Sequence, residues 1–371
     1  MKIVLLSDAN SIHTSKWVNS FAQRGHDVYL IYSKEHFPQV HPIDQRVKTI
    51  PLRYGGRMGY YLNAINLNRI IKHINPDVIN AHYASGYGTL ARMARVKNLV
   101  LSVWGSDVYN FPYQNKVNYK IIRKNLLYTK YIASTSKCMA EQVNKILGKE
   151  ERKIVVTPFG IDLKKFNPNK LKKEKEFLNV SVIKNLENIY GIDDFLKAMQ
   201  LALKKISKKD MLTAEKIRIN IYGEGEQEEA LRKLALDLEI ASITSFKGRI
   251  SNDLVPEKLS ETTVFCNMTK FRESFGVSVV EAMAMEVPVV VTDVDGTREI
   301  TDNGKAGILV PKGDIEVMAE QISELLLDDQ YRNKVGQKER IRVEKFYDWE
   351  KNVDIMEKYY REVVELSLIH I

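Results

Sequence analysis

Short apolar segments alternate with amphipathic helical segments along most of the chain, and this alternation constrains the fold more than any other feature. Lys2–Ser7 and Asp27–Tyr32 each have the apolar character of a buried strand. Trp17–Arg24, between them, has helical spacing, and Thr14 or Ser15 can cap its start. Two strands joined by a helix run parallel, because a parallel pair needs a long crossover connection. The sequence therefore predicts an α/β fold built on parallel sheets.

The same alternation continues through both halves of the chain. Further strands are predicted at Asp77–Asn80, Leu99–Val103, Ile132–Ser136, Ile154–Thr157, Leu178–Ile183, Ile217–Tyr222, Ile243–Lys247, Thr263–Cys266, Val287–Thr292 and Gly307–Val310. We expect Ile132–Ser136 to close the first sheet. A chain of 371 residues can hold two domains with separate cores. We place them at residues 1–157 and 158–350, with the polar, lysine-rich Lys164–Glu176 as a solvated linker.

Charge is divided unevenly between the two halves. Residues 1–157 contain 23 lysines and arginines against nine acidic residues, a net charge of +14, whereas the remainder has 33 against 38. Such asymmetry indicates an anionic partner for the first half. No zinc-finger, RRM or basic-zipper pattern accompanies the charge, so we do not expect nucleic acid. Two interpretations stay open: an anionic membrane surface or phosphate-bearing lipid acceptor, and a merely solvated basic surface.

Hydropathy and cysteine content indicate a cytoplasmic protein. No segment approaches the roughly 18 uninterrupted apolar residues of a membrane span. Met1–Leu6 is too short for the hydrophobic region of a secretory signal. Cys138 and Cys266 lie far apart and lack metal-ligand spacing, so we expect buried, reduced thiols. Peripheral attachment to the inner face of the membrane is the alternative that the basic half suggests.

The most specific stretch runs from Glu273 to Glu281 and reads Glu-Ser-Phe-Gly-Val-Ser-Val-Val-Glu. It follows the apolar segment Thr263–Met268, and Ser274 can cap a helix that starts there. Glu273 then lies at a strand exit, and Glu281 lies about two turns into the helix. A helix start suits a phosphate or a sugar oxygen, because it offers unpaired N–H groups and a partial positive charge. Two carboxylates, which only accept hydrogen bonds, suit a ligand rich in hydroxyls. The plain alternative is a pair of solvated surface glutamates.

This stretch resembles the paired-glutamate signature of the retaining family-4 glycosyltransferases, and the resemblance extends over nearly the whole chain. It implies the GT-B fold, in which two Rossmann-like domains face each other across a cleft that holds a nucleotide-sugar donor. By this resemblance Glu273 faces the donor sugar and Glu281 holds the nucleotide ribose. The backbone amides that assist are those of Ser274, Phe275, Gly276 and Val277. The closing helix, about residues 351–371, would pack back onto the first domain.

A second group of residues resembles the part of the family's site that holds the nucleotide. Lys184 follows a predicted strand at the place where relatives put a basic residue on the donor diphosphate, and a cation there makes a sensible clamp. The second basic residue of the family is Tyr190 here, so the clamp rests on Lys184 or on Arg249. Gly248, Arg249 and Ile250 belong to a loop that resembles the one whose backbone contacts the base. Gly223-Glu224-Gly225 resembles the family's Gly-x-Gly turn, although such a pair is usually just a tight turn.

Four residues of the first half are candidates for the acceptor side. In open parallel sheets ligands collect at the carboxyl ends of strands, where His82, Trp104 and Asp107 fall. We expect Trp104 to wall the sugar pocket, and Asp107 to hydrogen-bond to loops or to the acceptor. Many relatives have a histidine in place of Trp104, so the role of that histidine is not transferred. His13 lies in the first loop, where relatives have a Gly-Gly pair, and is either a site residue or a plain helix cap.

The stretch Pro51–Ile74 is unusual because Arg53–Tyr61 mixes basic residues, aromatic residues and glycines. This composition predicts a mobile loop that leads into a helix. The loop either contacts the acceptor or a lipid surface, or packs its tyrosines on the core. Both interpretations stay open.

Asp293-Val294-Asp295 follows an apolar strand, as the metal-binding Asp-x-Asp motif of the other large glycosyltransferase fold does. Here it falls in the loop after the glutamate pair, so we predict no metal site and no required cofactor. The resemblance implies transfer of a hexose from a UDP-linked or related donor to a glycan or lipid-linked acceptor, with retention of anomeric configuration. Two alternatives stay open. One is a GT-B sugar-nucleotide epimerase, and the other is a catalytically silent nucleotide-binding scaffold.

Overall fold

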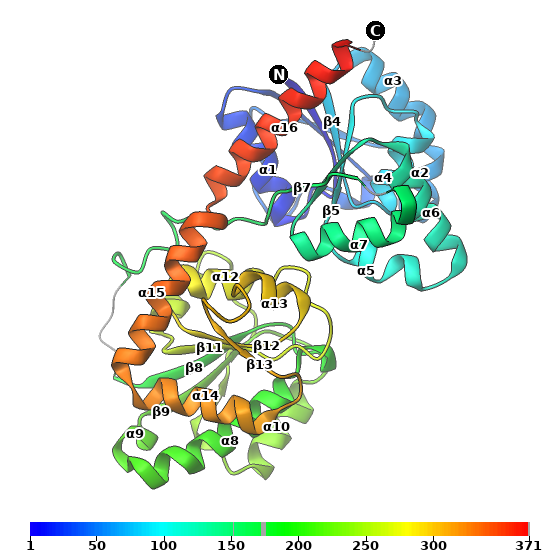
Figure 1. The fold of residues 1–371 in the computed structure, drawn as a ribbon. Helices are drawn as coiled ribbons and strands as arrows, with labels where there is room; N and C mark the ends of the chain where they lie inside the picture. The colour runs from blue at the N-terminus through cyan, green and yellow to red at the C-terminus, as the bar shows by residue number, and fades with distance from the viewer. Residues whose placement is uncertain (151, 172–175, 370–371) are drawn as a thin grey trace. The chain divides into compact units, whose positions relative to one another are not determined.

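The computed structural model describes residues 1–150, 152–171 and 176–369. The chain divides into two compact units: Met1–Phe159 with Glu350–Ile371, and Gly160–Trp349. Each unit is built on its own parallel sheet, and Figure 1 labels the strands and helices of both. The predicted α/β class with parallel sheets is confirmed. Part of the predicted linker Lys164–Glu176, residues 172–175, lies outside the described residues.

The sheet of the first unit has seven parallel strands in the order β3-β2-β1-β4-β5-β6-β7. The strands are β1 (Lys2–Leu6), β2 (Asp27–Tyr32), β3 (Lys48–Pro51), β4 (Val78–His82), β5 (Leu99–Val103), β6 (Tyr131–Ser134) and β7 (Val155–Val156). The helices are α1 (Ile12–Gln23), α2 (Gly56–Leu62), α3 (Ala64–Ile74), α4 (Gly86–Met93), α5 (Ser106–Tyr109), α6 (Lys116–Tyr128) and α7 (Lys137–Leu147). Short 3-10 turns lie at Lys34–His36, Phe111–Tyr113 and Gly148–Glu150. Both β4 and β5 are buried along their whole length and are mainly apolar, and their polar residues are Asn80, His82 and Ser102.

The sheet of the second unit has six parallel strands in the order β10-β9-β8-β11-β12-β13. The strands are β8 (Leu178–Ile183), β9 (Ile217–Tyr222), β10 (Thr244–Phe246), β11 (Val264–Asn267), β12 (Val289–Thr292) and β13 (Ile308–Val310). The helices are α8 (Ile192–Lys209), α9 (Met211–Glu215), α10 (Glu228–Asp237), α11 (Val255–Glu261), α12 (Val277–Ala284), α13 (Asp295–Ile300), α14 (Ile315–Leu327) and α15 (Asp329–Phe346). Two 3-10 turns lie at Asn188–Tyr190 and Ala241–Ile243. Figure 1 shows α12 and α13 on one side of this sheet and α8, α10 and α14 on the other.

The last helix, α16 (Trp349–Ile369), belongs with the first unit from Glu350 onward. Asn80 in β4 donates a hydrogen bond to the hydroxyl of Tyr360, 2.6 Å away and fully buried. On the outer side, Arg24 at the end of α1 pairs with Glu350, Asp354 and Glu357. These contacts bind α16 to elements at the other end of the sequence.

Several predicted boundaries in the first unit are wrong. The first helix starts at Ile12 with Ser11 at its N-cap, so neither Thr14 nor Ser15 is a cap. The hydroxyl of Thr14 instead lies 2.7 Å from that of Ser7, and the hydroxyl of Ser15 donates to the carbonyl of Ile12. Hydroxyl side chains suit both a cap and an internal bond to the helix backbone, and the sequence does not distinguish these uses.

Other corrections concern whole elements. The predicted loop Arg53–Tyr61 is largely helical, because α2 begins at Gly56. Strand β3 was not predicted, since Lys48–Pro51 is short and mostly exposed at the edge of the sheet. Nor does β6 close the sheet, because β7 pairs with its outer side. Short edge strands bury little apolar surface and so leave a weak pattern.

The helix after the paired-glutamate strand also differs from the prediction. It begins at Val277, with Gly276 at the N-cap in a left-handed conformation (φ 74°), so Ser274 is not its cap. Glu281 therefore lies just over one turn into the helix instead of two. Phe275 precedes the helix and is buried, with its ring 5.5 Å from that of Tyr347. Glycine adopts the left-handed backbone without steric cost, so the turn is made at Gly276.

Candidate functional site

The order of the second sheet reverses between β8 and β11, which are neighbours in the sheet although β9, β10 and the helices α8 to α11 separate them in sequence. Ligands of open parallel sheets bind at the carboxyl ends of strands where the order reverses in this way. Lys184 comes directly after β8, and Glu273 follows β11 by six residues. Both predicted catalytic residues therefore lie at the place where this topology favours a site.

Lys184 and Glu273 form a close ion pair, with 2.6 Å between Nζ and Oε2. Their side chains are 18% and 15% exposed, so the pair is largely shielded from water. The ammonium also lies 4.7 Å from the ring centre of Tyr190, close enough for a cation–π contact. Tyr190 thus holds the lysine from one side at the position where the family has a second basic residue.

A glycine turn determines where the Lys184 backbone lies. Gly223 directly follows β9 with φ at 146°, and a Cβ there would lie 1.8 Å from the carbonyl oxygen of Lys184. A Cβ on Gly225 would lie 2.4 Å from the carbonyl oxygen of Leu186. The Gly-x-Gly pair is therefore more than a tight turn, because two backbone segments approach there more closely than any side chain allows. On the other side, the amide of Gly296 donates to the carbonyl of Glu273.

A cavity of about 340 Å³ opens at the end of β8. Lys184, Tyr190, Arg249 and Ile250 line it, together with Tyr222 and Gly223 at the end of β9. Arg249 is exposed and has no ion pair with any described residue, so its guanidinium is available to a ligand. The cavity therefore presents two cations to whatever occupies it.

The remaining predicted donor-side residues do not line this cavity. Gly248 accepts a hydrogen bond from the amide of Gly223 through its carbonyl, which couples the two loops. Ser274 and Val277 are partly buried, on the segment between β11 and α12, and Glu281 is partly buried within α12. The structure thus brings Lys184, Glu273 and Arg249 to one end of the sheet, with the glycine-started helix beside them.

The Asp-x-Asp stretch is engaged with an arginine. Arg298 donates through Nε to Asp293, at 2.8 Å, and its guanidinium lies 3.8 Å from Asp295. No group of three potential metal-ligating side chains comes together among the described residues.

In the first unit three of the four candidate residues form one aromatic cluster. His82 lies 4.2 Å from Trp104 between ring centres, and His13 stacks on Phe159 at 3.7 Å while its edge meets Trp104. His82 is at the end of β4, not in a loop, and its Nδ1 is 2.8 Å from the hydroxyl of Ser7. Burial lowers the pKa of both His13 and His82 to about 3, and Lys16 adds to the effect at His13. Both imidazoles are therefore neutral at physiological pH.

Asp107 is buried, and its carboxylate is hydrogen-bonded to backbone amides. Its carboxylate accepts hydrogen bonds from the amides of Ala84, Gly105 and Trp104, at 2.8, 2.9 and 3.2 Å. Burial raises the pKa of Asp107 although these donors oppose the shift. Of the two roles open for Asp107, the structure shows the bracing of loops after β4 and β5.

Comparisons with known proteins agree with this architecture. Residues 2–136 match the family described as "Glycosyl transferase 4-like", and residues 162–342 match "Glycosyl transferases group 1". The chain is 24% identical over 362 residues to the N-acetyl-alpha-D-glucosaminyl L-malate synthase of Bacillus anthracis, covering 92% of this chain and 91% of that protein. Sucrose-phosphate synthase from Thermosynechococcus elongatus superposes over 99% of this chain and 100% of its own, with a TM-score of 0.79 and 18% identity. Anabaena Alr3699/HepE in complex with UDP superposes over 98% and 100%, with a TM-score of 0.75 and 16% identity.

The chain belongs to the family-4-like glycosyltransferases with the GT-B fold. The predicted family and fold are thus confirmed, and the comparisons favour neither the epimerase nor the silent scaffold. Among the described residues of this glycosyltransferase, no helix has the length and apolar character needed to cross a bilayer.

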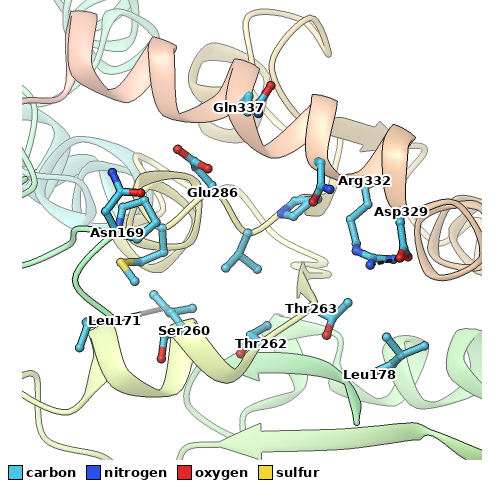
Figure 2. Close-up of a pocket in the computed structure, with 16 residues that line it drawn as sticks. Asn169, Leu171, Leu178, Ser260, Thr262, Thr263, Glu286, Asp329, Arg332 and Gln337 are labelled. Carbon is cyan, nitrogen blue, oxygen red and sulfur yellow. Dashed lines mark hydrogen bonds and ion pairs between the residues drawn. The ribbon is translucent and has the colours of Figure 1, made fainter. Parts of the chain in front are cut away.

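A larger cavity of the glycosyltransferase, about 520 Å³, lies at the amino ends of the strands in the second unit (Figure 2). Its lining includes Leu178 at the start of β8, Thr263 just before β11, and Asp329 and Arg332 on α15. The guanidinium of Arg332 donates hydrogen bonds to the carboxylate of Asp329 and to the carbonyl of Leu325. This cavity contains none of the predicted site residues and lies at the opposite end of the strands from Lys184.

Sequence reasoning missed the residues that support the site. Gly296 approaches the backbone of Glu273 so closely that a Cβ would lie 2.2 Å from its carbonyl oxygen. It also missed Tyr83 and Tyr87 of the first unit, whereas Tyr60 and Tyr61 belong to the stretch for which an acceptor contact was one of the two interpretations. A glycine among polar residues signals a turn, but the partner it approaches is known only from the fold.

Proposed function

We propose that this glycosyltransferase moves a hexose from a UDP-linked donor to a glycan or lipid-linked acceptor with retention of anomeric configuration. The observation that carries the proposal is the ion pair between Lys184 and Glu273 at the reversal point of the second sheet. It joins a cation suited to the donor diphosphate with a carboxylate suited to sugar hydroxyls. Structural neighbours include a protein in complex with UDP-glucose, and this supports a uridine nucleotide as the donor.

The proposed reaction breaks the bond between the anomeric carbon and the diphosphate oxygen while the acceptor hydroxyl attacks from the same face. The acceptor proton passes to the departing diphosphate. Positive charge develops on the sugar and negative charge on the leaving group, so the protein contributes mainly by positioning and by electrostatic stabilisation. In this proposal Glu273 orients the sugar and Lys184 stabilises the diphosphate.

Arg249 is the second cation of the proposed clamp, since it lines the same cavity as Lys184. Glu281 would bind the ribose hydroxyls, and the amides of Ser274–Val277 would assist at the start of α12. Two cations supply the positive charge that a divalent metal supplies in other sites, so we propose that no metal is required.

The first unit would hold the acceptor near a membrane. Four apolar side chains on α2 and the start of α3 are exposed, namely Met58, Tyr61, Leu62 and Ile65, at 63%, 40%, 54% and 69%. Exposed Arg53 and Arg57 flank them in a unit of strongly positive charge. Apolar and aromatic side chains beside cations favour the surface of an anionic bilayer. We therefore propose peripheral attachment to the cytoplasmic face.

A donor screen tests the proposed function. The purified protein would be incubated with UDP-, GDP- and ADP-linked hexoses, and release of nucleotide and sugar would be followed. We expect slow hydrolysis of a UDP-hexose, with the released sugar first appearing in the donor's own anomeric form by NMR. Conversion of the UDP-sugar to an epimer without release of UDP would contradict the proposal, as would no turnover of any donor.

A further inference from the structure

The order of the first sheet reverses between β1 and β4, and a cavity of about 560 Å³ lies at that point. Asp8, from the loop after β1, and Tyr83, directly after β4, line it. Arg57 and Tyr60 of α2 and the carboxamides of Gln114 and Asn118 complete the part of the lining considered below. We call this cavity the tyrosine pocket. None of the four predicted acceptor-side residues lines it.

The pocket's aromatic walls are held by backbone contacts. Tyr60 lies against Gly86, where a Cβ would be 2.5 Å from its ring, and its ring meets that of Tyr87 edge to face at 5.4 Å. Tyr83 is held in the left-handed backbone conformation (φ 68°), which is costly for an aromatic residue. Such backbone strain is concentrated at functional sites.

The polar groups of the pocket are partly unsatisfied within the protein. Burial is the main cause that raises the pKa of Tyr60 and Tyr83 to about 12, so both phenols are neutral donors at physiological pH. Neither hydroxyl has a hydrogen-bond partner among the described residues, whereas the hydroxyl of Tyr87 is 2.8 Å from the ring of His36. The side-chain amide of Asn118 donates a hydrogen bond to the side-chain oxygen of Gln114, so each carboxamide fixes the orientation of the other.

Charge in the pocket is suited to an anionic ligand that also has hydroxyls. Arg57 is exposed, and its guanidinium forms no ion pair with any described residue. One carboxylate oxygen of Asp8 accepts a hydrogen bond from the backbone amide of Asn10, and the other oxygen remains available to sugar hydroxyls. An aromatic face suits the apolar face of a sugar ring, and a guanidinium suits a phosphate.

We propose that the tyrosine pocket binds a sugar phosphate as the acceptor, with the sugar against Tyr60 and Tyr83 and the phosphate at Arg57. The acceptor role rests on the proposed glycosyl transfer, but binding itself does not. It departs from the sequence prediction for His82 and Asp107, which are each 1% exposed and hydrogen-bonded within the fold, and it keeps the acceptor contact that was one interpretation of Arg53–Tyr61. A soluble sugar phosphate and the headgroup of a lipid-linked sugar share this chemistry.

The test measures binding of glucose 1-phosphate, glucose and inorganic phosphate by calorimetry, in the presence of saturating UDP. We expect glucose 1-phosphate to bind most tightly of the three. Arg57→Gln should weaken its affinity about tenfold or more, on the scale of a lost charge-assisted hydrogen bond. Glucose affinity should change less than twofold. Arg53→Gln is the matched control, because Arg53 lies over the ring of Tyr54 and does not line the pocket.

A second variant tests the aromatic wall. Gly86→Ala should displace the Tyr60 ring and weaken binding of glucose and glucose 1-phosphate alike, with UDP affinity unchanged. The dodecyl ester of glucose 1-phosphate separates the two sources. Tighter Arg57-dependent binding of the ester would support a lipid-linked acceptor, and equal binding would support a soluble one.

Two results would overturn the proposal. One is equal affinity of the wild type and Arg57→Gln for glucose 1-phosphate. The other is loss of that binding in Lys184→Ala but not in Arg57→Gln, since the ligand would then occupy the donor cavity. Failure of UDP to bind would contradict the proposed function instead, and the Arg57 comparison without UDP would still decide the pocket.

Discussion

At the scale of single residues, Lys184 and Glu273 join the ends of two neighbouring strands through one ion pair. Removing either member leaves the other charged in a largely shielded place, so the two substitutions should not be additive. We expect Glu273→Gln to lower kcat by about tenfold or more, and Lys184→Ala to cost roughly 2–4 kcal/mol in transition-state stabilisation. The double variant should lose less than the sum of the two losses.

The measurement is kcat/KM for the UDP-hexose found in the donor screen. Arg298→Gln serves as the control, because Arg298 pairs with Asp293 and does not line the donor cavity. Near wild-type kcat/KM in both single variants would remove these residues from the catalytic site.

A second prediction at this scale concerns acid stability. The pKa of His13 is about 3 in the folded chain against a usual 6.5, because of burial first and Lys16 next. Between these values the unfolded chain binds more protons than the folded chain, so stability falls as the pH falls through this window. At pH 5 this effect amounts to about 2 kcal/mol for one histidine.

His13→Phe keeps the stacking on Phe159 and removes the titrating group. Urea unfolding at pH 7 and pH 5 should therefore show a smaller loss of stability in His13→Phe than in the wild type, by about 2 kcal/mol. An equal loss in both proteins would show that this ring does not control the acid sensitivity.

At the scale of elements, α2 and the start of α3 contribute both to the tyrosine pocket and to an exposed surface. Tyr60 and Tyr61 line the pocket, Tyr61 is also 40% exposed, and Leu62 and Ile65 are exposed outside it. We expect binding to vesicles that contain anionic lipid, weak binding to neutral vesicles, and release as salt rises, since each basic residue near the surface contributes about 1 kcal/mol and is screened by ions.

The triple variant Arg53→Glu, Leu62→Ser and Ile65→Ser should weaken vesicle binding and leave donor hydrolysis nearly intact. Met211→Ser with Leu212→Ser is the matched control, because these two side chains are 60% and 72% exposed in the other unit. Flotation of each protein with vesicles gives the comparison. Equal binding of the wild type to neutral and anionic vesicles would return the basic charge to an ordinary solvated surface.

At the scale of the whole molecule, the proposed chemistry depends on protein cations in place of a bound metal. Activity should therefore survive exhaustive treatment with EDTA, with kcat changed less than twofold. The assay is UDP release in metal-free buffer, with added Mg²⁺ or Mn²⁺ as the control. Loss of activity that either metal restores would contradict this part of the proposal.

The pattern of apolar and amphipathic segments was enough to predict the class of fold, and the resemblance to a family predicted the kind of site. The bounds of β5 and β9 were predicted to the residue. Burial along the whole of β5 makes it almost entirely apolar, and in β9 buried isoleucines alternate with the partly buried Arg218 and Asn220. Exposed or short elements such as β3 and α2 were missed, since little burial constrains them. The paired glutamates and Lys184 were singled out because their spacing and their place after predicted strands resemble the family's site.

The tertiary structure alone decided which of those residues meet. The contact of Lys184 with Glu273 joins positions 89 residues apart, and it follows from the adjacency of β8 and β11. His82 ends β4 and Asp107 follows β5, yet the fold buries both in contacts with its own groups. A sequence records which side chains are available at a strand end. Whether such a side chain meets solvent, a ligand or the protein's own backbone depends on the packing of segments distant along the chain, and single-chain patterns do not contain that packing.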